Sequence, residues 1–226
     1  HVQKGDLHAI VGENGAGKTT LMRILYGALS PSTGTVSVRG QVRNYRSSRD
    51  AIADRIGMVS QHYAIIPELT CLQNLMLGAE TGPVMNLAQC RARADELANR
   101  MGFSFDWSAK AETLGPAGAQ KLEILKLLWR NAEVMILDEP TAMLSPRDAD
   151  ALFESLRVLA RDGATVILVT HRLPEVVDYC QQGTVLRAGQ LIAHKQEQKA
   201  NKAELAEFSV GHALAEFASR ELPPSE

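Results

Sequence analysis

The sequence predicts an α/β fold whose mostly parallel sheet is interrupted by a helical subdomain. Three observations support this prediction: strand-like apolar runs alternate with helix-like segments, the strand pattern disappears between residues 70 and 130, and a glycine-rich turn directly follows the first strand. Apolar runs that do not alternate with polar residues are typical of strands covered by helices on both faces, as in a parallel sheet.

The first expected elements surround the glycine-rich turn. A strand over Leu7–Val11 precedes it and a helix over Lys18–Leu29 follows it. Further strands are expected over Thr35–Val38, which has glycine on both sides as turn residues, and over Ile56–Val59.

Between residues 70 and 130 only helical patterns remain. They cover Leu72–Leu77, Leu87–Met101 and Gln120–Arg130. We therefore predict a single domain with a core of residues 1–69 and 131–226 and a helical subdomain of residues 70–130.

Strands and helices alternate again after this insert. Strands over Val134–Leu137 and Thr165–Val169 are each followed by a helix, over Arg147–Arg161 and Leu173–Tyr179, in the order of β–α–β units. A hairpin is then expected at residues 184–193, helical segments at 202–208 and 212–217, and a linker-like Pro-Pro segment at 222–226.

Composition limits the classes of function. The 24 basic and 26 acidic residues nearly balance, so we expect no nucleic-acid partner. Cys71, Cys90 and Cys180 lack the spacing of a disulfide frame or zinc site, which indicates free thiols in a reducing compartment. No apolar run reaches the roughly 20 residues that span a bilayer, and residues 1–6 have no signal-peptide character. We expect a cytoplasmic protein that reaches a membrane only through a partner.

The glycine-rich turn reads GENGAGKT and matches the pattern GxxxxGK[ST] between the expected strand and helix. Glycines let backbone N–H groups surround a phosphate, Lys18 reaches the β- and γ-phosphates, and Thr19 can bind Mg²⁺. The alternative is a plain turn with a solvated lysine. We predict a nucleotide-binding loop made of Gly12, Glu13, Asn14, Gly15, Ala16, Gly17, Lys18, Thr19 and Thr20.

Two carboxylates, Asp138 and Glu139, end the strand that begins at Val134. Ligands bind at the carboxyl ends of strands in open α/β sheets, so Asp138 is expected beside the phosphate loop. One acid can hold Mg²⁺ through its water shell, and the next can orient or deprotonate the attacking water. A strand that ends in two solvated acids is the alternative.

Two further polar residues follow expected strands. His171 comes after Thr170 and is able to contact a γ-phosphate or fix a water, while Gln61 is able to reach Mg²⁺ or water. From position alone, a surface histidine and an ordinary loop glutamine remain alternative interpretations.

The order of these motifs resembles the ATP-binding domain of ABC ATPases. It runs GENGAGKTT, then VSQ at residues 59–61, a helical insert, LDEPTAMLSP, and Thr170-His171, and it covers essentially the whole chain. The segments VSQHYAIIPELTCLQNLMLG, QKLEILKLLWRNAEVMILDEPTAMLSP and THRLPEV are similar to those of bacterial sugar and nucleoside importer ATPases.

The resemblance implies a RecA-like P-loop NTPase core with a mixed, mostly parallel sheet. It also implies a head-to-tail dimer with ATP between one phosphate loop and the partner's signature loop, and membrane permease subunits that keep the protein on the cytoplasmic face of the cell membrane. It assigns Gln61 to a coupling loop, Glu139 to a catalytic base and His171 to a switch histidine. The implied Mg²⁺ ligands are Thr19, Gln61 and Asp138.

The signature loop departs from the LSxGxxQ pattern of the family. It is expected at Leu114, Gly115, Pro116, Ala117, Gly118, Ala119 and Gln120. Gly115 replaces the serine whose hydroxyl binds the partner's γ-phosphate, a loss of roughly 1.5–3 kcal/mol. We therefore favour an asymmetric dimer, with a different or fused second ATPase domain, over a homodimer with two weakened sites.

A second departure lies upstream of the phosphate loop. The family carries an additional strand and an aromatic residue that stacks on adenine, whereas residues 1–11 contain no Tyr, Phe or Trp. We expect a shortened N-terminus with weaker nucleotide affinity.

The sequence thus predicts an ATPase that powers an ABC importer for a sugar- or nucleoside-like solute. The alternative is a regulatory or degenerate ABC domain with little hydrolysis, which the altered signature favours and the intact Glu139 opposes. An ABC ATPase acting on DNA or ribosomes would show coiled-coil insertions or basic linkers, and a small-molecule P-loop kinase would not explain the LDEP and Thr-His motifs together.

Overall fold

The computed structural model describes residues 1–61, 64–79 and 86–196. A six-stranded sheet in the order β4-β5-β6-β1-β7-β8 forms its centre. All neighbouring strands are parallel except β7 and β8, which form an antiparallel hairpin. The strands are β1 (Leu7–Val11), β4 (Ile56–Val59), β5 (Val134–Asp138), β6 (Thr165–Thr170), β7 (Gln182–Arg187) and β8 (Gln190–Gln196). The predicted α/β class with a mixed, mostly parallel sheet is confirmed.

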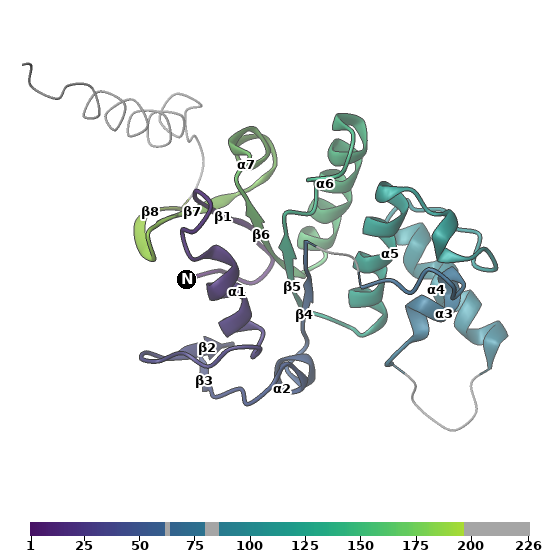
Figure 1. The fold of residues 1–226 in the computed structure, drawn as a ribbon, viewed down its shortest axis with the longest axis horizontal. Helices are drawn as coiled ribbons and strands as arrows, with labels where there is room; N and C mark the ends of the chain where they lie inside the picture. The colour runs from purple at the N-terminus through teal and green to yellow at the C-terminus, as the bar shows by residue number, and fades with distance from the viewer. Residues whose placement is uncertain (62–63, 80–85, 197–226) are drawn as a thin grey trace, which may run out of the picture.

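Helices cover both faces of this sheet, as the uninterrupted apolar strands require. On β6, Ile167 and Val169 pack with Met22 of α1 (Lys18–Leu25) on one face. Val166 and Leu168, which alternate with them, belong to the cluster of α6 (Pro146–Arg161) on the other. Figure 1 shows α1 and α6 on opposite sides of the strands. A seventh helix, α7 (Leu173–Tyr179), buries Val176 against β1.

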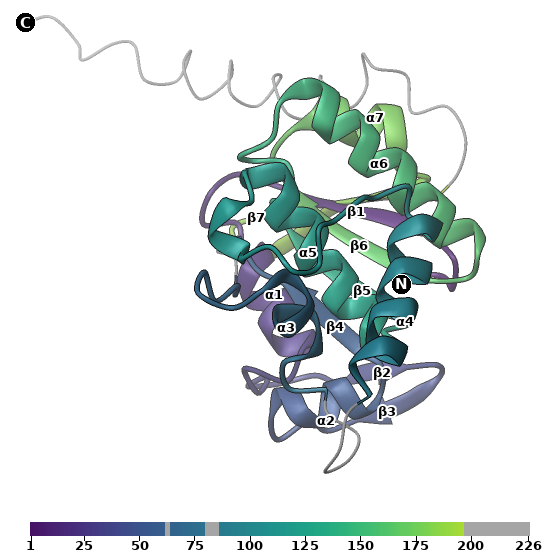
Figure 2. The ribbon, with the colours of Figure 1, turned by 90° about the vertical axis from the view of Figure 1, so that its right-hand side faces the viewer.

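The segment between β4 and β5 is helical where the structure describes it, apart from its connecting loops. It contains α3 (Cys71–Met76), α4 (Leu87–Arg100), the short 3₁₀ helix η1 (Ala111–Thr113) and α5 (Pro116–Trp129). These helices group together on the side of the molecule away from the β7–β8 hairpin (Figures 1 and 2). Trp107 and Trp129 are buried in the core that these helices form.

Several boundaries differ from the predictions for local reasons. The helix after the phosphate loop ends at Leu25 instead of Leu29, because Gly27 takes a positive φ of 70°. Helix α5 begins four residues before the predicted Gln120, because Pro116 at its first position presets a helical φ. Elements missed from the sequence are β3 (Gln41–Arg43), which pairs with β2 (Val36–Val38), α2 (Ser48–Ala53) and η1.

The predicted helical segments at 202–208 and 212–217 and the linker-like segment at 222–226 lie outside the described residues. The three cysteines are free, as predicted. In the part of the chain that the structure describes, none of the helices combines the length and apolar character that crossing a membrane requires.

Candidate functional site

The glycine-rich loop connects the carboxyl end of β1 to the start of α1. Gly15 and Gly17 have φ values of 82° and 95°, a region that side chains disfavour, and Gly17 is the N-cap of α1. A turn bond from Ala16 N to the Glu13 carbonyl, 3.1 Å, closes the loop. The loop therefore presents the partial positive charge of a helix N-terminus, where anions bind.

Lys18 lies folded over this loop. Its Nζ donates to the carbonyl oxygens of Gly12 and Glu13 at 2.6 and 3.0 Å, and the side chain is buried. The amine is therefore fixed by the loop backbone directly beside the residues that would surround a phosphate.

Gly12 sits where the loop passes close to β7. A Cβ atom there would lie 2.3 Å from the carbonyl oxygen of Leu186 and 3.0 Å from the Cβ of Ala16. The first glycine of the motif is thus required by packing against the neighbouring strand.

Asp138, the last residue of β5, lies next to the start of α1. The Thr19 hydroxyl donates to its Oδ2 at 3.2 Å. Burial raises the pKa of the Asp138 carboxyl, the negative charge of Glu139 adds to this rise, and the Thr19 hydrogen bond opposes it. Thr19 and Asp138 thus form a compact oxygen-rich pair that suits Mg²⁺, a cation that prefers oxygen ligands.

Glu139 is held in an unusual backbone conformation, with φ at 50°. Its N–H donates to the Val169 carbonyl on β6 at 2.9 Å. One carboxylate oxygen, Oε1, accepts a hydrogen bond from His171 Nδ1 at 2.8 Å, while Oε2 is buried and has no partner among the described residues. The Glu139 side chain is 12% exposed and that of His171 is 56% exposed. This acid has one oriented oxygen and one available to accept a proton from water.

These residues line one cleft of about 330 Å³ at the carboxyl edge of the sheet. Its walls are Asn14, Gly15, Ala16, Gly17, Lys18, Thr19, Thr20, Gln61, Asp138, Glu139, Ala142 and His171. The structure thus brings Gln61 and His171 together with the phosphate loop and both acids. Ala142, which no sequence pattern singled out, completes the wall.

A largely buried carboxylate, whose side chain is 12% exposed, braces this cleft and was not predicted from the sequence. Glu175 accepts hydrogen bonds from the hydroxyls of Thr141, at 2.7 Å, and Thr170, at 3.1 Å. It thereby joins the loop after β5 to the loop after β6, which carry Glu139 and His171. The available signal was an acidic residue in the first turn of the helix that follows His171, where a carboxylate lies close to the end of the preceding strand.

The predicted signature segment lies elsewhere. None of the residues 114–120, all of which the structure describes, lines the cleft. Gly115 is the exposed N-cap of α5 with no side chain to cap the helix, and Pro116 and Gly118 belong to its first turn. Gln120 is only 2% exposed and faces the interior. Gly115 and Pro116 are thus the exposed residues of the segment, and residues 117–119 are half-buried.

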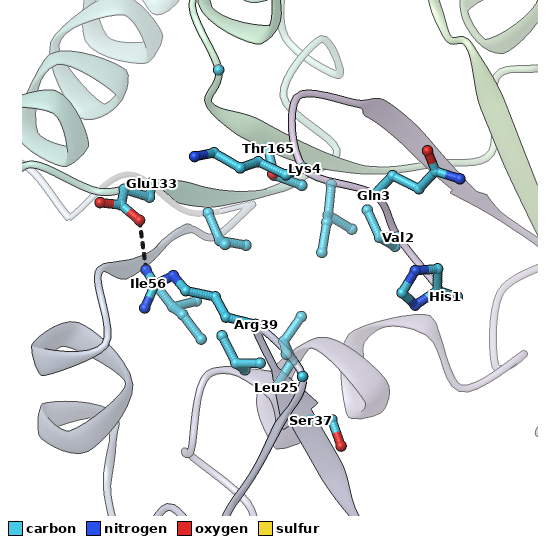
Figure 3. Close-up of a pocket in the computed structure, with 15 residues that line it drawn as sticks. His1, Val2, Gln3, Lys4, Leu25, Ser37, Arg39, Ile56, Glu133 and Thr165 are labelled. Carbon is cyan, nitrogen blue, oxygen red and sulfur yellow. Dashed lines mark hydrogen bonds and ion pairs between the residues drawn. The ribbon is translucent and has the colours of Figure 1, made fainter.

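A larger cleft, about 620 Å³, lies at the opposite edge of the sheet (Figure 3). It is lined by the amino ends of β4, β5 and β6, with side chains such as Ile56, Val134 and Thr165. Its carboxylate, Glu133, is paired with Arg39 at 2.7 Å. Because ligands of open α/β sheets bind at the carboxyl ends of the strands, the smaller cleft is the candidate active site.

Comparisons with known proteins identify the family of this chain. The family model described as ABC transporter matches residues 1–142. The glucose import ATP-binding protein TsgD13 of Haloferax volcanii is 40% identical in an alignment of length 250. This alignment covers 97% of this chain and 46% of that protein. The ribose import ATP-binding protein RbsA 1 of Burkholderia thailandensis is 40% identical and the nucleoside import ATP-binding protein NupA of Lactococcus lactis 38% identical, each with 43% of its length covered. The chain spans about half the length of these relatives.

Solved structures share the fold over nearly the whole chain. A nucleotide-free ATP-binding cassette from an ABC transporter superposes with a TM-score of 0.82 at 25% identity, covering 94% of this chain and 89% of the other. A dimeric post-hydrolysis cassette, MJ0796 bound to ADP and Pi, has a TM-score of 0.76 at 25% identity and covers 88% of each chain. The resemblance to sugar and nucleoside importer ATPases is confirmed.

The contact at Gly12 predicts a large loss of stability in Gly12→Ala. The added methyl group would overlap the Leu186 carbonyl, so the free energy of unfolding should fall by about 1–3 kcal/mol in urea titrations. Gly115→Ala is the matched control, because Gly115 has φ −70° and nothing within 4 Å of its added Cβ. Equal effects of the two substitutions would contradict the assigned packing.

The raised pKa of Asp138 predicts that Asp138→Asn stabilises the folded chain at neutral pH. Burial gives the Asp138 carboxyl a higher pKa in the folded chain than in the unfolded chain. The free energy of unfolding therefore falls as the pH rises from the unfolded pKa through the folded pKa, and the loss is complete above the folded pKa. The variant should therefore melt higher than the parent at neutral pH, and the difference should vanish toward the ordinary carboxyl pKa of about 4. A pH-independent difference in Tm would exclude this explanation.

Proposed function

The chain belongs to the ABC transporter family of ATP-binding domains, and from this we propose that it binds and hydrolyses ATP to drive an importer for a sugar- or nucleoside-like solute. The observation that carries the proposal is the position of Glu139. Its carboxylate, with an unpaired Oε2, lines the same cleft as Lys18 and Thr19. The solute class rests on the names of the relatives, which are glucose, ribose and nucleoside import proteins.

Each residue of the cleft has a proposed role. Residues 12–20 bind the phosphates through backbone N–H groups and the Lys18 amine. Glu139 accepts a proton from the attacking water, and His171 orients Glu139 through its 2.8 Å bond and reaches toward the γ-phosphate. The Glu175 brace maintains the spacing between the two loops.

The cleft also fits Mg²⁺. Thr19 and Asp138 already share a hydrogen bond, and Gln61 lines the same wall, so these three side chains would supply oxygen ligands. When bound with ATP, Mg²⁺ neutralises charge on the phosphates and orients them for in-line attack. The chain's own contribution is to fix the two acids at the end of β5.

The partner that we propose is a second ABC ATPase domain, which would meet the cleft with its own signature segment. Because Gly115 lacks the hydroxyl expected there, we favour an asymmetric or tandem pair. Relatives of more than twice the matched length have room for such a second domain. Membrane permease subunits would hold the pair at the cytoplasmic face of the membrane.

A nucleotide-binding regulatory domain with little hydrolysis is the second candidate. The Gly115 replacement favours it, because a weakened signature reduces closure around ATP. The paired Glu139 and His171 favour the hydrolase, since this geometry is not needed for binding alone.

Glu139→Gln tests the proposed function. Steady-state turnover of ATP should fall by about 10²–10⁴-fold because the base is lost, while ATP affinity changes little because the phosphate loop is untouched. Size-exclusion chromatography with ATP would report dimer formation in parallel. Turnover that survives the substitution would exclude Glu139 as the base, and a parent chain that binds ATP without hydrolysing it would favour the regulatory alternative.

Gly115→Ser should strengthen ATP-driven association when placed in the Glu139→Gln background. The restored hydroxyl adds a hydrogen bond to the partner's phosphate, so the midpoint ATP concentration should fall by about tenfold or more. As the N-cap of α5 it should also add a few tenths of a kcal/mol of stability. Gly115→Ala adds the same carbon without the hydroxyl and should leave the midpoint unchanged; an equal shift in both variants would contradict the hydroxyl's role.

A further inference from the structure

A buried ion pair within α5 lies close to the Gln61 segment. Lys126 Nζ and Glu123 Oε1 are 2.8 Å apart, and their side chains are only 9% and 7% exposed. The same amine donates a second hydrogen bond, 2.7 Å, to the backbone carbonyl of Ala64. Ala64 is three residues after Gln61 in the chain. Because three extended residues span at most about 11 Å, the Cα atom of Gln61 must lie within that distance of the Cα atom of Ala64.

A second buried polar side chain anchors the residues that follow Ala64. Asn74 of α3 is fully buried, and its Oδ1 accepts from the Ile66 N–H at 2.8 Å. Its Nδ2 donates to the Ile66 carbonyl at 2.9 Å. The backbone at Ala64 and Ile66 is thus bound to helices α5 and α3 by buried side chains.

Helix α5 also packs directly on the strand that leads to Gln61. The Cδ2 atom of Leu127 lies 2.8 Å from where a Cβ of Gly57 would be, so helix and strand are in close contact. Adjacent residues of α5 therefore contact the chain on both sides of Gln61: Leu127 before it, on β4, and Lys126 after it, at Ala64.

A buried ion pair is a weak device for stability alone, because apolar residues of similar volume often do as well or better. Its specific contribution here is a charged donor for the Ala64 carbonyl, which an apolar residue cannot supply. We propose that Lys126 is a positioning residue for Gln61, with Glu123 holding its amine in place. The inference rests on the proposed function, in which Gln61 contacts Mg²⁺ bound with ATP.

This role gives α5 two functions at its two ends. Its N-terminus carries the predicted signature residues, which would face the proposed second domain, and Lys126 contacts Ala64, three residues after Gln61 of this chain's own cleft.

The test is a double-mutant cycle that joins E123M/K126M with Gln61→Ala. Replacing both charges avoids an unpaired buried charge, so the variant should fold. The measurement is affinity for ATPγS by calorimetry, with and without Mg²⁺. We expect E123M/K126M to reduce the Mg²⁺-dependent gain in affinity by about tenfold, and to have no further effect when Gln61 is already Ala. Lys110→Met, which removes the exposed pair with Glu112, is the control and should change neither value.

Additive effects of the two changes would overturn the proposal, because they would show that Lys126 acts on binding without Gln61. Amide hydrogen exchange gives a second readout, in which E123M/K126M should accelerate exchange at Ile66 by on the order of tenfold and leave β6 unchanged. Unaltered exchange at Ile66 would also overturn it. If the double variant does not fold, E123Q/K126M, which also leaves no buried charge unpaired, is measured in the same way.

Neither ATPγS binding nor hydrogen exchange requires hydrolysis. The proposed ATPase function and the proposed role of Lys126 can therefore be contradicted independently. A parent chain without Glu139-dependent turnover contradicts the proposed ATPase function, whereas the binding cycle and hydrogen exchange still decide the role of Lys126.

Discussion

The close approach of the phosphate loop to β7 is the constraint on which the candidate site depends. Strand β1 lies between β6 and β7, and at its end the backbone of Gly12 passes so near the Leu186 carbonyl that no side chain fits. This contact fixes where the loop turns, and the loop fixes the start of α1 and the position of Lys18. Thr19 then meets Asp138 because β5 ends at the same edge of the sheet. A single steric limit thus sets the geometry of the glycine-rich loop and of the Lys18 and Thr19 side chains that follow it.

The acidic side of the cleft depends on a different balance. Burial disfavours the charged form of Asp138 and so raises the pKa of its carboxyl. Glu139 has a positive φ, a backbone conformation that costs residues other than glycine roughly 1 kcal/mol or more. Both are stabilised by neighbours: the Thr19 hydroxyl for Asp138, and the Val169 carbonyl and His171 for Glu139. The burial of Asp138 and the strained backbone of Glu139 are both unfavourable by themselves. The surrounding sheet therefore stabilises a geometry that these two residues would not adopt alone.

Much of this arrangement was predictable from the sequence, because it follows from local patterns. The strands at Leu7 and Ile56 were placed correctly, since continuous apolar runs beside glycine leave few alternatives. Residues 12–20, Asp138 and Glu139 were identified from spacing alone, and they line or support one cleft together with Gln61 and His171.

The features that were missed are either short elements or contacts between residues far apart in the sequence. Helix α2 and strand β3 are short and carry no periodic pattern of their own. Glu175 looks like an ordinary helical acid until Thr141, 34 residues away, is seen to donate to it. Likewise, Lys126 contacts Ala64 across 62 residues of chain. Periodicity reports which face of an element is apolar, and it contains no information about which buried polar groups will meet.

The altered signature and the intact cleft have separate consequences because they lie at different places on α5. Replacing serine by Gly115 removes a group from the exposed N-cap, where it would serve a nucleotide bound to another domain. The interior of the same helix keeps Glu123 and Lys126 paired and in contact with Ala64. In the proposed pair, loss of the hydroxyl would therefore weaken the site that this chain completes for its partner without changing the cleft that it builds for itself. Such an asymmetry is useful only if the second domain differs from the first, and for this reason we propose an asymmetric or tandem pair rather than two identical copies.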